Sequence, residues 1–240
     1  MYSRTFCTRL AIILLVIFIS LPAAFAQKNK KKTQFTVVID PGHGGVDPGA
    51  LGKKAKEKGI TISCDLNYRK KLWSREKAGE VMAQLMPYVD VCIANEEDAA
   101  DVFGIHAAHT DIEGGKLDYA AYESVARQLS QRFGCKKVAI TLRSSLSAFD
   151  NDWAGMLYTE GQAYFSPTYR IHIVDRVGGG DSFGGGLIYG FMQGFDAQQT
   201  IEFAVAASCL KQTIELDVNL SKPNDILALV GGDGSGRVQR

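Results

Sequence analysis

Ile171-His-Ile-Val-Asp-Arg-Val-Gly-Gly-Gly-Asp-Ser-Phe-Gly-Gly-Gly-Leu-Ile-Tyr-Gly-Phe-Met192 is the stretch of sequence that decides the fold. Its first four residues predict a short β-strand, and the apolar residues after Asp181 predict a helix that runs to Met192. Between them, Gly178, Gly179 and Gly180 allow successive backbone N–H groups to converge on one point, where the helix N-terminus adds positive partial charge. We therefore expect these glycines to form an anion hole.

Asp181 would lie at the mouth of this hole. A carboxylate in that place binds phosphate poorly, but it can take a proton from an attacking hydroxyl group. Donor groups beside a carboxylate therefore indicate phosphoryl transfer to an alcohol, through positioning and electrostatics. The alternative is a tight strand–helix turn in which Asp181 only caps the helix.

Strands and helices alternate along the rest of the chain. This alternation predicts a three-layer α/β fold, with a mostly parallel sheet and helices on both faces. Asn151 and Asp152 predict the turn of a hairpin whose strands are 145–149 and 156–159. The other expected strands are 35–39, 60–66, 88–94, 137–142, 163–165 and 171–174, and the expected helices are 74–86, 96–103, 119–133, 181–192, 197–210 and 223–230.

Length, composition and charge narrow the function classes. The chain has 240 residues, 46% hydrophobic and 22% charged, which excludes a disordered, collagen-like or coiled-coil protein. The 27 basic and 26 acidic residues leave a net charge of +1, so we expect no nucleic-acid partner.

The N-terminus has the features of a secretory signal peptide. Arg4 and Arg9 precede an apolar run from Leu10 to Leu21, and a small-residue cleavage pattern ends at Ala26. We expect residues 1–26 to direct export to the periplasm or cell surface and to be the only membrane contact; an uncleaved anchor is the alternative. The later cysteines are widely spaced without a C-x-x-C pair, a usage typical of a reducing compartment. The export signal and the cysteine pattern disagree.

The stretch Asp175–Phe183 resembles the second signature of ribokinase-like (PfkB-type) carbohydrate kinases. Arg176 and Gly179 replace the threonine and alanine of that signature, and glycine preserves the backbone hole. The resemblance implies that Asp181 is the catalytic base, that the three glycines bind phosphate, and that ATP and magnesium are the cofactors.

Two earlier segments match the same family in the same order. The stretch Asp65–Trp73 resembles a motif whose arginine reaches the sugar acid or its incoming phosphate, which implies this role for Arg69 with Asn67. The stretch Asn95–Asp98 resembles the N-x-x-E motif that organises magnesium. Asp98 is one methylene shorter than the family's glutamate, so Glu97 is a second candidate beside it. The alternative for each segment is a strand end or a helix cap.

Within the family, the segments Ile140–Ser144, Asp150–Trp153 and Gly231–Gln239 are similar to 2-keto-3-deoxygluconate kinases. This similarity implies nucleotide and a small sugar acid as ligands, and phosphate contact by Arg143, for which a surface ion pair is the alternative. The resemblance covers 59–240, the C-terminal part of the fold, without the family's first strands, sugar-binding glycines or lid. We therefore expect turnover far below that of an intact member, or a non-catalytic nucleotide-binding remnant.

The segment 36–50 instead resembles the start of zinc-dependent N-acetylmuramoyl-L-alanine amidases, exported enzymes that cut peptide from peptidoglycan. The resemblance matches His43 and Glu57 to two zinc ligands, but the third histidine segment and the later catalytic glutamate are not recognisable. We expect these residues to be vestigial and zinc to be no cofactor, with amidase activity as the alternative function.

The expected organisation is a signal peptide (1–26), an amidase-like strand and loop (27–58) and a kinase part (59–240), joined as a chimera; an unusual but genuine family is the alternative.

Overall fold

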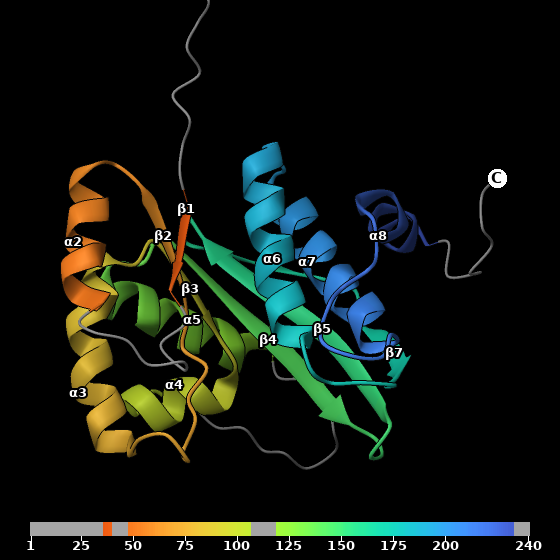
Figure 1. The fold of residues 1–240 in the computed structure, drawn as a ribbon, viewed down its shortest axis with the longest axis horizontal. Coiled ribbons are helices and arrows are strands. Elements are labelled where there is room, and N and C mark those ends of the chain that lie inside the picture. The colour runs from red at the N-terminus through yellow and green to blue at the C-terminus, as the bar shows by residue number, and fades with distance from the viewer. Residues whose placement is uncertain (1–35, 40–47, 107–118, 233–240) are drawn as a thin grey trace, which may run out of the picture. The chain divides into compact units, whose positions relative to one another are not determined.

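Figure 1 shows the computed structural model of the chain, in which residues 36–39, 48–106 and 119–232 are described. The predicted signal peptide at 1–26, the linker that follows it and His43 lie outside the described residues. Within the described part, no helix combines the length and the apolar character needed to cross a membrane.

The described strands are β1 (Thr36–Ile39), β2 (Thr61–Asp65), β3 (Val91–Ala94), β4 (Lys137–Ser145), β5 (Asp150–Thr159), β6 (Gln162–Phe165) and β7 (Tyr169–His172). The described helices are α2 (Pro48–Glu57), α3 (Arg75–Leu85), the 3₁₀ turn η2 (Met86–Tyr88), α4 (Glu96–Phe103), α5 (Tyr119–Phe133), α6 (Gly179–Gln193), α7 (Ala197–Gln212) and α8 (Pro223–Val230).

These strands form one mixed sheet in the order β1-β2-β3-β4-β5-β6, with β7 also paired to β5. The first four strands are parallel, and β5 runs antiparallel to β4, β6 and β7. In Figure 1, α2 to α5 cover one face of the sheet and α6 and α7 cover the other. The predicted three-layer, mostly parallel α/β fold is confirmed.

Two apolar clusters fill the space between these layers. On one face, Met82 of α3 and Leu129 of α5 pack against Ile62 and Ile140 of the sheet. On the other face, Phe183 and Leu187 of α6 and Ile201 of α7 pack against Ile93 of β3 and Leu157 of β5. The helix that follows the three glycines is therefore held against the sheet by its own buried side chains.

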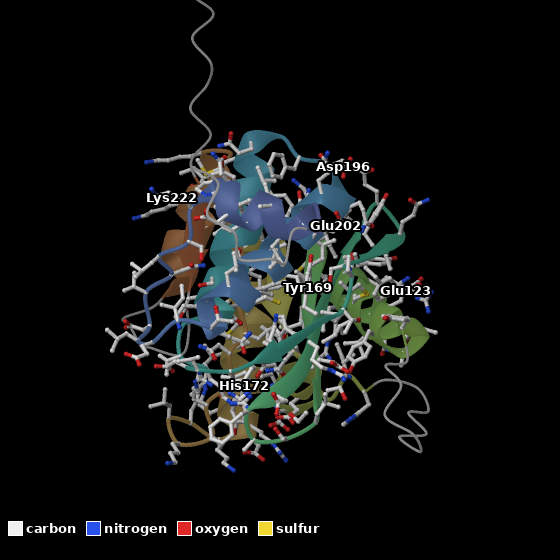
Figure 2. The ribbon with its side chains drawn as sticks, turned by 90° about the vertical axis from the view of Figure 1, so that its right-hand side faces the viewer. Glu123, Tyr169, His172, Asp196, Glu202 and Lys222 are labelled. Atoms are coloured by element: carbon white, nitrogen blue, oxygen red, sulfur yellow. The ribbon has the colours of Figure 1, made fainter. Side chains whose placement is uncertain are left out.

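The predicted hairpin turn at Asn151 and Asp152 is wrong. Both residues lie inside β5, and the chain turns earlier, where Leu146 and Ser147 donate backbone hydrogen bonds to Asp150. Long-range partners hold this end of β5 extended: Asp152 is paired with Arg170 of β7, and Asp150 Oδ1 lies 2.9 Å from Nδ1 of His172, which is labelled in Figure 2.

The segment before residue 59 belongs to the same sheet. β1 pairs in parallel with β2, with Thr36 opposite Thr61, and α2 connects the two strands. The charged residues 53–57 form the second half of α2. The boundary at 58/59 stays a prediction.

Asp90 connects α2 to the sheet. Its carboxylate accepts hydrogen bonds from Lys56 Nζ of α2 at 2.7 Å and from the backbone N–H of Ile62 at 3.1 Å, and Lys136 Nζ lies 3.2 Å away. Burial raises the pKa of this carboxyl, but the bonds from Lys56, Ile62 and Lys136 outweigh burial and leave the pKa below its ordinary value. Asp90 therefore stabilises the fold in its ionised form.

Replacement of Asp90 by alanine is expected to lower the free energy of unfolding by about 2 kcal/mol at pH 7. The main cause is the buried N–H of Ile62, which loses its acceptor, whereas the ion pairs add little because both lysines are exposed. Since the folded pKa is depressed, the part of this contribution that depends on the ionised carboxylate is fully present above the unfolded pKa of about 3.9 and is lost as the pH falls through the folded pKa. Urea unfolding of both proteins at pH 7 and pH 3 measures the difference.

The matched control is Asp101→Ala, which removes the acidic partner of another basic side chain, the exposed Arg75. Its effect should stay within about 0.5 kcal/mol. Equal losses for the two variants at pH 7, or an Asp90 effect that persists unchanged at pH 3, would contradict the assigned role.

Candidate functional site

The three glycines lie where β7 leads into α6. Gly178 is the N-cap of this helix and has a φ of 78°, in the left-handed region that favours glycine. A Cβ atom at this position would also overlap the carbonyl oxygen of Asp217. Gly179 and Gly180 are the first two helical residues, so the helix begins two residues earlier than predicted and Asp181 lies in its first turn.

The loop before the glycines is anchored from two sides. Asp175 accepts hydrogen bonds from the backbone N–H of Val177 at 2.9 Å and of Leu216 at 3.1 Å. Arg176 donates to the carbonyl oxygen of Ala148 at 2.9 Å and, with the Asn151 amide in its hydrogen-bonded orientation, to that amide oxygen at 3.1 Å. Arg176, which replaces the family's threonine, therefore connects this loop to the turn between β4 and β5.

The first turn of α6 offers an anion its unpaired N–H groups. The N–H of Gly179 already donates to the carbonyl oxygen of Arg176 at 3.2 Å, whereas the following N–H groups of a first helical turn have no intrahelical acceptor. Ser208 of α7 donates its hydroxyl to the carbonyl oxygen of Gly179 at 2.8 Å. The backbone around the glycines is held in place, and an anion here would bind mainly at Gly180 and Asp181.

Asp181 is exposed and lies on the wall of a cavity of about 360 Å³. The cavity combines apolar residues of α6, α7 and α8 with polar residues of the segment that joins the last two helices. Its lining is Asp181, Ser182, Gly185, Gly186, Tyr189, Phe203, Ala207, Asp217, Asn219, Ser221, Pro223 and Ile226. A volume of this size and a lining of this kind suit a small organic ligand with a flat apolar part and a few polar groups.

A second cavity, of about 200 Å³, lies at the ends of β3 and β4. Asn95, Glu97 and Arg143, three of the residues predicted from the sequence, line it together with Thr141, Ser145 and Trp153. Arg143 and Trp153 are register partners, so the two side chains share one face of the sheet. Trp153 packs in the same apolar cluster as Phe183, two residues after Asp181, which places this cavity on the α6 side of the sheet.

Asp98 lies apart from this cavity lining and is buried. Its two oxygens accept the backbone N–H groups of Tyr68 at 3.0 Å and Asn95 at 3.3 Å, and its own N–H donates to the Asn95 side chain at 2.8 Å. Burial raises the pKa of the Asp98 carboxyl, and the two N–H groups together with Arg69 offset only part of that rise. The predicted magnesium residues thus divide: Glu97 faces the cavity, and Asp98 fixes the start of α4.

Through Tyr68, Asp98 also holds the loop that carries Asn67 and Arg69. Asn67 is half-buried with a φ of 35°, and Arg69 is exposed. Neither residue lines the two cavities just described. Their placement puts the substrate candidates on a loop next to the first turn of α4 rather than in the cavity beside Asp181.

Sequence reasoning missed several lining residues. Trp153 lies in a segment recognised by its similarity to a family, but no role was assigned to it. If β5 had been recognised as one strand opposite β4, the register would have placed Trp153 beside Arg143. Asp217 and Asn219 had no signal in the sequence, because their place in the cavity depends on how the segment after α7 folds back.

Of the two predicted zinc ligands, only Glu57 lies in the described part of the chain. Glu57 is exposed at the end of α2. Among the described residues, no group of three or more His, Cys, Asp or Glu side chains could hold a metal ion.

Comparison with known proteins gives consistent matches. The sequence profile of the pfkB family carbohydrate kinases matches residues 43–217. The crystal structure of 2-dehydro-3-deoxygluconokinase from Thermotoga maritima is 46% identical, with a TM-score of 0.75, and the match covers 82% of this chain and 60% of that chain. A PfkB family carbohydrate kinase from Listeria grayi is 30% identical, with a TM-score of 0.72, over 83% of this chain and 61% of its own.

A curated relative, 2-dehydro-3-deoxygalactonokinase from Haloferax volcanii, is 28% identical over 78% of this chain and 52% of its own length. The chain therefore spans about half to three fifths of the length of these relatives.

Proposed function

Because the chain belongs to the pfkB family of carbohydrate kinases, we propose that it transfers the terminal phosphoryl group of ATP to a hydroxyl group of 2-keto-3-deoxygluconate or a closely related sugar acid. The observation that carries this proposal is the first turn of α6, where Asp181 follows the three glycines and lies on the wall of a 360 Å³ cavity. The named activities of the similar proteins from Thermotoga maritima and Haloferax volcanii support the sugar-acid class.

The larger cavity suits the nucleotide. Phe203 and Ile226 offer apolar surface for a purine ring, and Asp217 and Asn219 offer polar groups for a ribose. A nucleotide bound there can extend its phosphates toward the first turn of α6, where N–H groups and the helix dipole favour negative charge. This arrangement leaves Asp181 beside the terminal phosphate.

The smaller cavity suits the charges of the phosphate chain. Arg143 supplies a planar guanidinium that can bind phosphate oxygens bidentately. Magnesium would be held by Glu97 with phosphate oxygens and water, since this ion prefers oxygen ligands and keeps several waters. When bound, it neutralises the charge that develops on the transferred group.

In the proposed reaction, Asp181 accepts the proton of the acceptor hydroxyl. The oxygen of that hydroxyl forms a bond to the terminal phosphorus of ATP, while the bond from this phosphorus to the leaving ADP oxygen breaks. The N–H groups at the start of α6 stabilise the charge on the transferred phosphoryl group. Arg69 and Asn67, on the loop that Asp98 holds, are proposed to bind the carboxylate end of the sugar acid.

The test is an assay of the purified full chain with ATP, magnesium and 2-keto-3-deoxygluconate, with the products identified by phosphorus NMR. We expect a phosphate ester of the sugar acid and one ADP for each ester formed, with none formed when magnesium is omitted. Gluconate and ribose serve as acceptor controls and should react more slowly. Absence of any ester, from protein shown to be folded by circular dichroism, would refute the proposed activity.

A further inference from the structure

Trp153 carries a buried polar atom without a partner. Its side chain is 9% exposed, and Nε1 has no hydrogen-bond acceptor among the described residues. The indole N–H is a donor only and usually finds an acceptor when it is buried. Trp153 lines the 200 Å³ cavity, and its buried donor points to an acceptor that the described residues do not supply.

Trp153 is one of the residues that line the 200 Å³ cavity, together with residues of β4. Thr141, Arg143 and Ser145 follow one another at every second residue of β4, so they share a face, and Arg143 is directly opposite Trp153. Trp153 packs in one cluster with Ile93 and Phe183, which hold the first turn of α6 against the sheet. The indole therefore shares a sheet face with the phosphate candidate Arg143 and packs in the cluster that contains Phe183 of α6, the helix that carries Asp181.

The lining of this cavity has several hydrogen-bond donors and a single negatively charged side chain. Arg143 and Trp153 only donate, and the hydroxyl groups of Thr141 and Ser145 can donate as well, whereas Glu97 is the single carboxylate. A ligand group that satisfies such a lining carries several acceptor oxygens and negative charge. Phosphoryl oxygens and a carboxylate both meet this description.

We propose that Trp153 is a ligand-binding residue whose Nε1–H donates a hydrogen bond to an anionic oxygen of the bound ligand. The inference rests on the proposed kinase function, which supplies both sources of such an oxygen: the phosphate chain of ATP and the carboxylate of the sugar acid. The role of the indole is to select for a charged oxygen beside Arg143 and to hold it in one position. This role goes beyond packing, because the ring alone would fill the same space.

Trp153→Phe separates the two roles, since phenylalanine keeps an aromatic ring in the cluster that contains Phe183 and removes the N–H. Loss of one hydrogen bond to a charged group is expected to weaken binding by about 10- to 100-fold. The binding partners to be titrated by calorimetry are Mg-ATP, magnesium tripolyphosphate, adenosine and 2-keto-3-deoxygluconate. Adenosine has neither phosphate nor carboxylate, so its affinity should not change.

The matched control is Trp73→Phe, which alters the other of the two tryptophans. Trp73 is half-buried on the loop before α3 and lines neither cavity, so this variant should bind Mg-ATP, magnesium tripolyphosphate and adenosine like the unaltered chain. The sugar acid is left out of this control because the same loop carries Arg69. In the Trp73→Phe background Trp153 is the only indole, and its fluorescence should change on addition of the ligand that it binds.

Each outcome decides the proposal. Weaker binding of Mg-ATP and tripolyphosphate identifies the phosphate chain as the partner, and weaker binding of the sugar acid alone identifies the carboxylate. Unchanged affinities for all probes, or an equal loss for adenosine, would overturn the role of the N–H while the kinase proposal stands. If the unaltered folded chain binds none of the four probes, both proposals are refuted.

Discussion

Replacing Gly178 by alanine is expected to lower the free energy of unfolding by about 2–5 kcal/mol. A side chain at a φ of 78° costs about 1–2 kcal/mol, and the added Cβ would overlap the backbone of Asp217, which adds a cost of about 1–3 kcal/mol. The second cost is hard to relieve, because the Asp217 atoms that the Cβ would meet are backbone atoms and not the end of a flexible side chain. The N–H of Leu216, its neighbour, is also held by Asp175.

The comparison variant is Gly185→Ala, in the same helix. No atom lies within 4 Å of a Cβ at this position and its φ is helical, so alanine should stabilise α6 by up to about 1 kcal/mol. Urea unfolding of the two variants beside the unaltered chain measures both effects. Similar stabilities for the two variants would mean that the segment at Asp217 moves away easily, and the glycine would then have a role in ligand binding alone.

Signals between residues close together in the sequence were sufficient to predict most of the helices. Ser74, Asn95 and Asp196 each accept a hydrogen bond from the N–H three residues later, as N-cap residues do, and the helices they begin were predicted within two residues of their ends. Asp98 and Gln199 complete capping boxes for two of these helices. Such signals act between residues a few positions apart, so the sequence alone contains them.

The failed hairpin shows where local signals lose to distant ones. Asn151 and Asp152 favour turns, yet Asn151 is fully buried and Asp152 bonds to Arg170, eighteen residues later in the chain. Pairing with β4 on one side and β7 on the other supplies more hydrogen bonds than a two-residue turn could. Because this advantage comes from strands far along the sequence, turn propensity gave the wrong result.

The same limit applies to the site. The glycines and Asp181 could be placed at a helix start because a strand, a break and a helix follow one another directly in the sequence. The partners of Arg143 depend on the register between β4 and β5, and the cavity beside Asp181 depends on the segment after α7. Asp98 is the intermediate case: its motif was recognised, but the structure uses both of its oxygens for backbone N–H groups.

The larger catalytic effect is expected for Asp181→Asn. If Asp181 takes the proton of the acceptor hydroxyl, the side-chain amide of asparagine in the variant cannot take it. The kcat for phosphorylation of 2-keto-3-deoxygluconate should therefore fall by about 10²- to 10⁴-fold. The Kd for Mg-ATP should stay within a small factor or improve, because removing a negative charge beside the phosphates does not weaken their binding. Steady-state rates with saturating substrates and calorimetric titration of Mg-ATP measure the two quantities separately.

Asp181 is also an acidic residue in the first turn of a helix, where it stabilises the dipole of α6. A loss of this stabilisation in the variant has to be distinguished from a loss of catalysis. Glu76 has the same property in α3, where it is exposed and lines neither cavity, so Glu76→Gln is the matched control. Both variants should lose a similar, small part of their stability through the dipole, and only Asp181→Asn should lose turnover. If turnover of the asparagine variant falls no further than that of Glu76→Gln, Asp181 is a helix-capping charge and the proton must go to another group.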